Sequence, residues 1–411
     1  MLDLRDRFFV PDPPAVELRA FTHGLMPKTV PALMDRFVED WRTRGVDAWN
    51  EVPNHWRPGS DEPVGWWSLP EYLGDAFLAP MLGARAGTCI MQPNVHWTVQ
   101  ALLSCPEPFA GGPREVVFTD GEFPSVQHSI RQWADLQGLV PRSVPLGPDG
   151  FVDVDAVLDA VGDETAWVFL SHVGFATGEK LTDEALQAIA ERAHRHGALF
   201  AIDGYHATGS VPLDVEGLGA DVYFGGLLKE ACGSTGNAYL YVRAGLALTP
   251  RLAGWFADAD PFGFRPEPRP HPDVRRRFLA GTTAVASLYH AVEGLRVLLD
   301  AGLDAVRADA IEKTGLAIAH ADRLGLALRS PRAAERRGVM VVLAVPEATR
   351  LSEWLKTRGV YTDSRRNEVL RLAPFVWNTA DGIARAFEAV EEGLRTGAHL
   401  RYAPEAAGPV T

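Results

Sequence analysis

Lys229 and Asp203 are the residues of this sequence whose types and positions could do chemistry. Asp203 directly follows the apolar run 199–202, His206 comes three residues later, and Lys229 ends the next segment, 221–229. A lysine amine can attack a carbonyl carbon, and a buried carboxylate can pair with a protonated ring nitrogen. Only five of the 40 basic residues are lysines, which favours a chemical role for Lys229 over an ordinary solvated one.

The segments around these residues alternate between short apolar runs and amphipathic stretches. We predict strands at 116–119, 167–170, 199–202, 222–225 and 239–242, a helix at 125–136, and a second helix that Thr182 caps. Strands that alternate with helices indicate an α/β fold with a mostly parallel, doubly wound sheet. In such a sheet Ser171, Asp203 and Lys229 would meet at the carboxyl edge, where ligands bind.

A change of pattern near residue 283 predicts a second, smaller α/β domain. A helical stretch there leads to strands at 339–343 and 369–372 and to helices at 351–358 and 380–394. The segment 258–272 is rich in proline and charge, and we expect a long ordered loop. We therefore predict an N-terminal segment (1–45) that packs on the small domain, a large domain (46–285) and a small C-terminal domain (286–411).

Composition excludes several classes of function. The chain has 411 residues, 46% of them hydrophobic, which is enough for a large core and a smaller second one. Its formal charge of −13 favours neither nucleic acid nor an anionic membrane as partner. The start lacks a signal peptide, no apolar run is long enough to span a bilayer, and three cysteines without metal-ligand spacing indicate reduced thiols, so we expect a cytoplasmic protein.

A metal site is not expected either. His96, His128 and His172 do not form an i, i+4 pair on one helix with an acid between them. We interpret them as polar residues at the edge of a site or at the surface.

These features together resemble kynureninase, a class-V member of the fold-type-I enzymes that depend on pyridoxal 5′-phosphate (PLP). The resemblance covers nearly the whole chain. It implies a fold-type-I transferase architecture, a large domain built on a seven-stranded sheet, and PLP as the cofactor. The stretches that carry it are Phe123–Ser125, His172–Gly178, Asp203–Pro212, Leu228–Lys229, Ala253–Phe256, Phe278–Thr282 and Val369–Pro374.

The resemblance assigns cofactor-binding roles to particular residues. Lys229 would hold PLP as a Schiff base, and Asp203 would keep the pyridine nitrogen protonated, which makes the ring an electron sink. Phe123 would stack on the ring. Pro93 and Asn94 would open a helix whose N-terminal amides meet the phosphate.

Four further residues have implied roles in binding the phosphate or the substrate. His206 would also approach the phosphate. Trp255 and Thr282 match positions that reach the phosphate of the neighbouring subunit, which implies a homodimer with shared active sites. Arg371 matches an arginine that binds the α-carboxylate of an amino-acid substrate through a bidentate fork.

The sequence departs from the family pattern at positions close to the chemistry. Leu228 stands where kynureninases have a tyrosine that binds phosphate and transfers protons, and Val126 stands where an aspartate is typical. The segments 19–24 and 92–94 also differ from the family pattern. Tyr205 or Glu230 could supply a substitute acid.

The remaining residues predict an enzyme that cleaves a Cβ substituent from an L-amino acid. Lys229, Asp203 and Arg371 suffice to bind an amino acid as a Schiff base and to remove its Cα proton. The bond that breaks would be C–S or C–C, as in a lyase or hydrolase of specialised metabolism. The alternatives are true kynureninase activity, decarboxylation-coupled or oxidative deamination to an aldehyde, and aminotransfer. A non-catalytic binding protein is disfavoured because both Lys229 and Asp203 are present.

Overall fold

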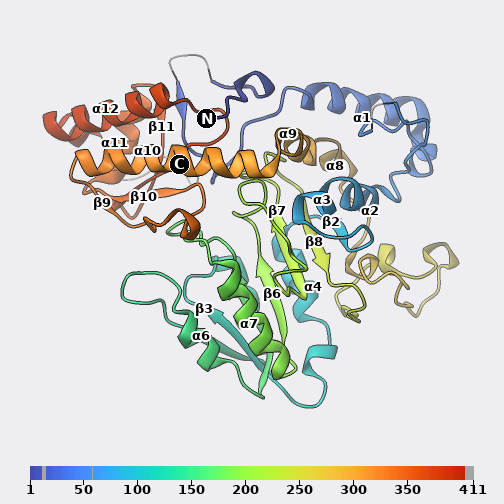
Figure 1. Ribbon diagram of the computed structural model, residues 1–411. Coiled ribbons are helices and arrows are strands. Elements are labelled where there is room, and N and C mark those ends of the chain that lie inside the picture. The colour runs from blue at the N-terminus through green and yellow to red at the C-terminus, as the bar shows by residue number, and fades with distance from the viewer. Residues whose placement is uncertain (12–14, 58, 403–411) are drawn as a thin grey trace.

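A seven-stranded sheet forms the centre of the larger lobe in the computed structural model, which describes residues 1–11, 15–57 and 59–402 (Figure 1). The strand order is β2-β8-β7-β6-β5-β3-β4. β4, β3, β5, β6 and β7 run parallel, whereas β8 is antiparallel to both of its neighbours. The predicted fold class is confirmed. The strands are β2 (Cys89–Gln92), β3 (Glu115–Thr119), β4 (Val140–Val144), β5 (Thr165–Ser171), β6 (Leu199–Asp203), β7 (Val222–Gly226) and β8 (Ala238–Val242).

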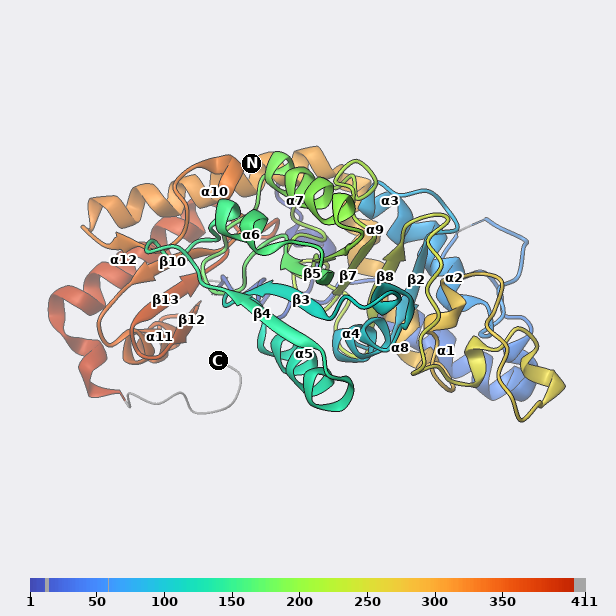
Figure 2. The same ribbon diagram turned by 90° about the horizontal axis from the view of Figure 1, so that it is seen from below.

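Helices cover both faces of this sheet. α6 (Val154–Ala160) and α7 (Asp183–Arg195) lie on one face, and α4 (Val95–Leu103) and α5 (Pro124–Gln137) lie on the other (Figure 2). The strands read as continuous apolar runs because side chains that alternate along a strand are buried in both layers. Ile202 of β6, for example, packs in the core beneath α7, and its neighbour Ala201 packs in the core beneath α4 and α5.

Local signals in the sequence explain where two of these helices begin. Thr182 caps α7, with its hydroxyl accepting a hydrogen bond from the Ala185 amide at 3.2 Å, and the first turn of α7 is acidic. Asn94 caps α4 in the same way, and its side chain accepts from the Trp97 amide at 2.8 Å.

The smaller lobe is built on a four-stranded antiparallel sheet with the order β12-β13-β10-β9. Its core contains side chains of α10, α11 and α12. The strands are β9 (Ala327–Leu328), β10 (Val341–Ala344), β12 (Asp363–Arg365) and β13 (Val369–Leu372), and the helices are α10 (Leu303–Arg323), α11 (Ala348–Lys356) and α12 (Ala380–Thr396).

The N-terminal segment contacts both lobes. β1 (Val16–Glu17) pairs in parallel with β11 (Val360–Tyr361) in the smaller lobe. α1 (Val30–Arg44) packs against α8 (Val285–Ala291), whose apolar side chains belong to the core of the larger lobe, as do those of α9 (Glu293–Ala301). The bounds that we predict for the domains stay predictions, and their last residues, 403–411, lie outside the described part.

Short helices and turns complete the larger lobe around β2. α2 (Leu69–Leu73) leads through a π-helical turn to α3 (Ala79–Leu82), and α2 contacts β2. The segment 258–272 contains a 3₁₀ turn at Pro261–Gly263 and a bridge between Asp258 and Pro270.

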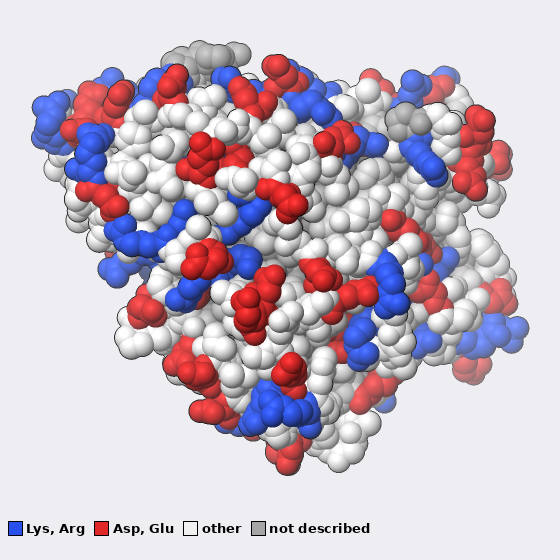
Figure 3. All heavy atoms as spheres, viewed as in Figure 1, with Lys and Arg blue, Asp and Glu red and all other residues white. Residues whose placement is uncertain are grey.

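The surface shows interspersed acidic and basic side chains on the face drawn in Figure 3, without a field of one sign. None of the described helices is both long enough and apolar enough to cross a membrane.

Candidate active site

Lys229 lies just beyond the carboxyl end of β7, in a turn that follows Gly226. Its Nζ atom lies 2.8 Å from Nε2 of His206, a buried residue that follows β6. Burial lowers the pKa of Lys229 to about 8, although the carboxylates of Glu230 and Asp203 oppose that shift. A lysine of this kind is a nucleophile near neutral pH because a useful fraction of its amine is unprotonated.

Asp203 ends β6, one strand away from β7. Its Oδ1 accepts a hydrogen bond from the Tyr205 amide at 2.8 Å, and its Oδ2 has no hydrogen-bond partner among residues 1–11, 15–57 and 59–402. Burial raises the pKa of Asp203 to about 6, and Lys229 partly offsets this. A buried carboxylate with one unused oxygen suits a protonated ring nitrogen, which would return this pKa to a low value.

Aromatic rings surround the Lys229 amine. Nζ lies 4.4 Å from the centre of the Tyr205 ring and 5.6 Å from that of Phe123. The Phe123 side chain is 42% exposed, and its ring meets that of Phe175 edge-on at 5.3 Å. An exposed aromatic face beside the lysine can support a flat cofactor ring.

Glycines make room for this arrangement. A Cβ atom on Gly226 would lie 2.4 Å from the Tyr205 ring, so the ring can reach the lysine only over a residue without a side chain. A Cβ on Gly24 would lie 2.2 Å from the carbonyl oxygen of Lys229. The N-terminal segment therefore passes directly against the backbone of the lysine, and the Gly24 amide donates to the Leu228 carbonyl at 3.0 Å.

Pro93 and Asn94 lie at the same edge of the sheet as Lys229. Gln92 at the end of β2 pairs with Ala238, and Ala238 pairs with Gly226 at the end of β7. Asn94 caps α4, whose N-terminal amides suit an anion. Gln92 is 3% exposed, yet neither polar atom of its side chain has a partner in the described structure. An unpartnered buried amide beside a helix N-terminus fits a bound polar group.

Thr282 and Trp255 lie on a loop that borders this region. A cavity of about 100 Å³ lies between Gln92, Pro93 and the loop containing Thr282. Trp255 is 42% exposed, and its indole donates to the Pro261 carbonyl at 2.6 Å. The contact of either residue with a cofactor phosphate in a neighbouring subunit stays a prediction.

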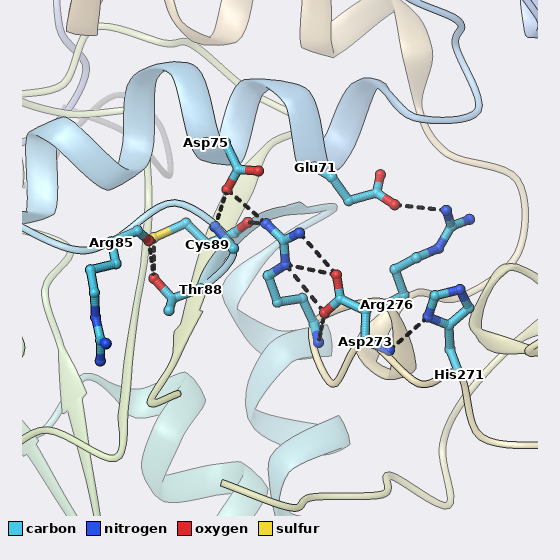
Figure 4. A network of polar contacts seen from close by, with 10 residues as sticks. Glu71, Asp75, Arg85, Thr88, Cys89, His271, Asp273 and Arg276 are labelled. Carbon is cyan, nitrogen blue, oxygen red and sulfur yellow. Dashed lines mark hydrogen bonds and ion pairs between the residues drawn. The ribbon is translucent and has the colours of Figure 1, made fainter. Parts of the chain in front are cut away.

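A network of charged residues anchors that loop to the larger lobe (Figure 4). Arg275 donates to Asp75 at 2.8 Å, to the Cys89 carbonyl at 2.9 Å, and to both carboxylate oxygens of Asp273. Arg276 forms an ion pair with Glu71 at 2.8 Å. These bonds join the loop to β2 and to the helical segment before it.

Arg371 on β13 brings a cation from the smaller lobe to the site. Its Nε and Nη2 donate to Asp363, and its Nη1 donates to the Phe175 carbonyl at 3.0 Å. Three of the five guanidinium N–H groups are used in this way, and the other two have no partner in the described part of the chain. The positive charge of Arg371 also lowers the pKa values of Lys229 and His206, although burial has the larger effect on both. The sequence did not indicate that Asp363 holds this arginine in place.

Glu122 is a second group that sequence reasoning missed. It is fully buried and accepts hydrogen bonds from Ser171 at 2.6 Å and from Thr119 at 2.9 Å. Burial raises the pKa of Glu122 to about 7, and Asp203 adds to the shift. The one signal in the sequence is that Glu122 directly precedes Phe123.

The three histidines that we interpreted as polar residues at the edge of a site or at the surface lie in different places. His96 and His128 are exposed, whereas His172 is buried and contacts the Tyr223 hydroxyl at 3.0 Å. Among the described residues, no group of three or more His, Cys, Asp or Glu side chains could hold a metal ion.

The chain belongs to the class-V aminotransferase family, which it matches over residues 99–364. It is 30% identical over 314 residues to an uncharacterized aminotransferase, YcbU, of Bacillus subtilis, covering 76% of this chain and 80% of that protein. It is 26% identical over 387 residues to a kynureninase of Geobacillus thermodenitrificans, covering 92% and 87%, and 28% identical over 381 residues to kynureninases of Burkholderia pseudomallei, covering 90% and 86%. The predicted kynureninase-like class-V membership is confirmed.

Solved structures with the same fold include a cysteine desulfurase from Thermococcus onnurineus. It has a TM-score of 0.78 at 18% identity and covers 93% of this chain and 95% of its own. The lyase C-DES, in a variant with glycine covalently linked to its PLP cofactor, has a TM-score of 0.79 at 18% identity and covers 93% and 100%. PLP is the cofactor of this class-V chain, and the lysine, the carboxylate and the exposed aromatic ring described above fit it.

Proposed function

We propose that this chain is a PLP-dependent lyase or hydrolase that removes a Cβ substituent from an L-amino acid by breaking a C–S or C–C bond. The observation that carries the proposal is the placement of the Lys229 amine. It lies at the carboxyl edge of the sheet, next to the strand that ends in Asp203, and burial brings its pKa close to neutral. A proton can therefore leave and return to this amine under ordinary conditions.

Different residues of the chain would have different roles in such a reaction. PLP, when bound, supplies an electron sink for the bonds at Cα of the substrate. Asp203 would hold a proton at the ring nitrogen through Oδ2. Lys229 Nζ would take the Cα proton, and His206 Nε2, at 2.8 Å, lies where it can accept a proton from Nζ. Phe123 would support one face of the ring and limit its contact with water.

The α-carboxylate of the substrate would bind to Arg371. Two guanidinium N–H groups remain beyond those that contact Asp363 and Phe175. The ring of Phe21 lies 4.7 Å from the guanidinium carbon and covers it. This apolar cover strengthens a charge-assisted hydrogen bond by excluding water.

Both candidate bonds, C–C and C–S, have support among the similar proteins. Kynureninases of Burkholderia pseudomallei are 28% identical to this chain, and a solved structure with the same fold is a cystine C–S lyase in complex with cysteine persulfide. Leu228 lies between Leu227 and Lys229 and carries no group that can transfer a proton. We therefore place an S-substituted cysteine ahead of kynurenine as substrate, and we retain kynureninase activity as the second candidate.

A homodimer with shared active sites belongs to the same proposal. Trp255, Phe262 and Phe264 form an exposed aromatic cluster in which Trp255 stacks on Phe264 with ring centres 6.0 Å apart. Such a cluster is typical of an interface. A cytoplasmic location is also part of the proposal, and it is supported by three cysteines that are all buried and unpaired.

Product analysis of the PLP-loaded protein tests the proposed reaction. We expect an S-substituted cysteine to give a thiol, pyruvate and ammonia in equal amounts, or kynurenine to give anthranilate and alanine. Lys229→Ala should abolish either conversion. Formation of a new amino acid from an added 2-oxo acid, or release of carbon dioxide without the Cβ fragment, would contradict Cβ cleavage and support the alternatives.

A further inference from the structure

Glu230, His206 and Lys229 form a continuous hydrogen-bonded line. Glu230 Oε1 lies 3.2 Å from His206 Nδ1, and His206 Nε2 lies 2.8 Å from Lys229 Nζ. Lys229 and Glu230 are neighbours in the turn after β7, and His206 follows β6, so two adjacent strands bring the three groups together.

Glu230 is buried in a place where an ionised carboxylate destabilises the folded chain. It is 1% exposed, its Oε2 has no hydrogen-bond partner in the described part of the chain, and His206 is its one ion-pair partner there. A buried carboxylate without a compensating charge destabilises the folded protein. A proton shared between His206 and Lys229 can supply that charge.

The order of the three groups determines which atom carries which proton. A carboxylate at Nδ1 accepts the Nδ1–H of the imidazole, so Nε2 of a neutral His206 presents a lone pair to the lysine amine. A proton that moves from Nζ to Nε2 gives an imidazolium that Glu230 stabilises. Leu228, the residue before the lysine, takes no part in this transfer.

We propose that Glu230 acts through His206 as a positioning residue that holds the exchangeable proton at Lys229, in place of a proton-transferring side chain at position 228. The inference deepens the proposed function and rests on it for its catalytic meaning. Its physical content, a link between Glu230 and the lysine proton, stands without any substrate.

Other charges also act on the two titrating groups. Asp203 raises the pKa of Lys229, whereas Arg371 and Arg365 lower it, and Arg371 also lowers the pKa of His206. Glu230→Gln alters none of these groups, and glutamine has nearly the same size and shape as glutamate. A shift in that variant therefore reports on the carboxylate of Glu230.

The pH dependence of Lys229 acetylation in the cofactor-free chain measures the proton directly. With five lysines in the sequence, peptide mass spectrometry resolves each one, and Lys28 and Lys356 serve as internal standards. We expect Glu230→Gln to lower the midpoint for Lys229 by about one pH unit, a roughly tenfold weaker hold on the proton. In the PLP-loaded protein, the pH midpoint of the visible absorbance should fall in the same direction.

Two further variants test whether Glu230 acts on Lys229 through His206. The simpler explanations are a direct effect of the Glu230 charge and a general effect of losing a buried carboxylate. Glu179→Gln removes another buried carboxylate, one that pairs with Arg336 and is not among the charges that shift the pKa of Lys229, so it should leave the Lys229 midpoint unchanged. In a His206→Gln background, Glu230→Gln should shift the midpoint by less than half as much as in the native background. An unchanged midpoint in Glu230→Gln, or an equal shift in both backgrounds, would overturn the proposal. Because no substrate is present, this outcome is independent of whether Cβ cleavage occurs.

Discussion

At the scale of single residues, the site is a small set of ionisable groups whose surroundings move their pKa values toward neutrality. Burial raises the pKa of Asp203 to about 6 and that of Glu122 to about 7, and it lowers that of Lys229 to about 8. Groups of this kind cluster at functional sites because proton transfer works best near the operating pH.

Lys229 gives the first prediction at this scale. Reduction of the PLP-loaded protein with borohydride should fix one pyridoxyl group on the peptide that contains Lys229, because this is the amine with the lowered pKa beside Asp203. Lys229→Ala should lose this label and at least about 10³-fold of the turnover. Mass spectrometry of the reduced peptides checks the position, and a label on Lys180 or Lys313 instead would contradict it.

Asp203 gives the second prediction, which concerns how stability changes with pH. The direction of this change follows from the raised pKa of Asp203. The folded cofactor-free chain holds the Asp203 proton up to about pH 6, because burial raises this pKa, whereas the ordinary aspartate pKa of 3.8 applies to the unfolded chain. Stability is therefore lost as pH rises from about 4 to 6, by about 3 kcal/mol in total. Asp203→Asn should remove this loss.

Urea unfolding of the cofactor-free chain at pH 4.5 and at pH 7 checks the Asp203 prediction. The variant should gain stability over the native chain at pH 7 and little at pH 4.5. In the same variant PLP should bind more weakly, since an amide cannot compensate a protonated ring nitrogen. Equal stability of the two proteins at both pH values would show that the carboxylate is not destabilised by burial.

Several of these residues could be predicted from the sequence, and others could not. Asp203 and Lys229 were visible because each follows an apolar run that becomes a strand of the parallel sheet. Glu122 could not be predicted, because a single acidic residue before Phe123 cannot be distinguished in the sequence from an ordinary turn residue. The contact of His206 with Lys229 also required the structure, because strand spacing does not set the direction of an imidazole ring.

At the scale of elements, the two lobes each bring part of the site. β6 and β7 supply Asp203 and the turn with Lys229, and β13 of the smaller lobe supplies Arg371. Arg371 contacts the Phe175 carbonyl, so the two lobes meet at this arginine. Period and caps predicted β3, β5 to β8, β10, β13 and the helices α5, α7, α11 and α12, whereas α1, α6, β2 and β4 were not predicted. The partner of Arg371, Asp363, lies on a three-residue strand too short to be recognised.

Arg371 gives a prediction that belongs to this scale. Arg371→Lys should raise KM for the amino-acid substrate about 10- to 100-fold, because a lysine cannot replace two parallel hydrogen bonds to a carboxylate. Lysine keeps the charge beside the buried Asp363, so the fold should remain intact. Steady-state kinetics check the result, and an unchanged KM would remove Arg371 from the substrate site.

Gly24 gives a second prediction about the fit between elements. A Cβ at this position would lie 2.2 Å from the Lys229 carbonyl, so Gly24→Ala must displace the turn that carries the lysine. We expect a loss of about 1–3 kcal/mol in stability and lower activity. Gly162→Ala is the matched control, since its Cβ would meet open space. Thermal unfolding of both variants checks this, and equal behaviour would place the N-terminal segment away from the lysine.

At the scale of the whole molecule, the exposed aromatic cluster predicts association. Phe264 is 75% exposed and Phe262 is 64% exposed. The net charge of −13 opposes random aggregation, so association at this cluster would be specific. Light scattering should give twice the chain mass of 44.8 kDa. Phe264→Asp should weaken the dimer, whereas Leu136→Asp, at an exposed position on α5, should not. A PLP-loaded monomer would refute shared active sites.

The bond that breaks is the central claim, and it is tested most directly by the products of one reaction. The PLP-loaded protein is incubated with an S-substituted L-cysteine and with L-kynurenine in parallel, and the released Cβ fragment is quantified against pyruvate or alanine. The account predicts equal amounts of the two products from one of these substrates and none with Lys229→Ala. An amino group transferred to an added 2-oxo acid, with the Cβ bond intact, would contradict it.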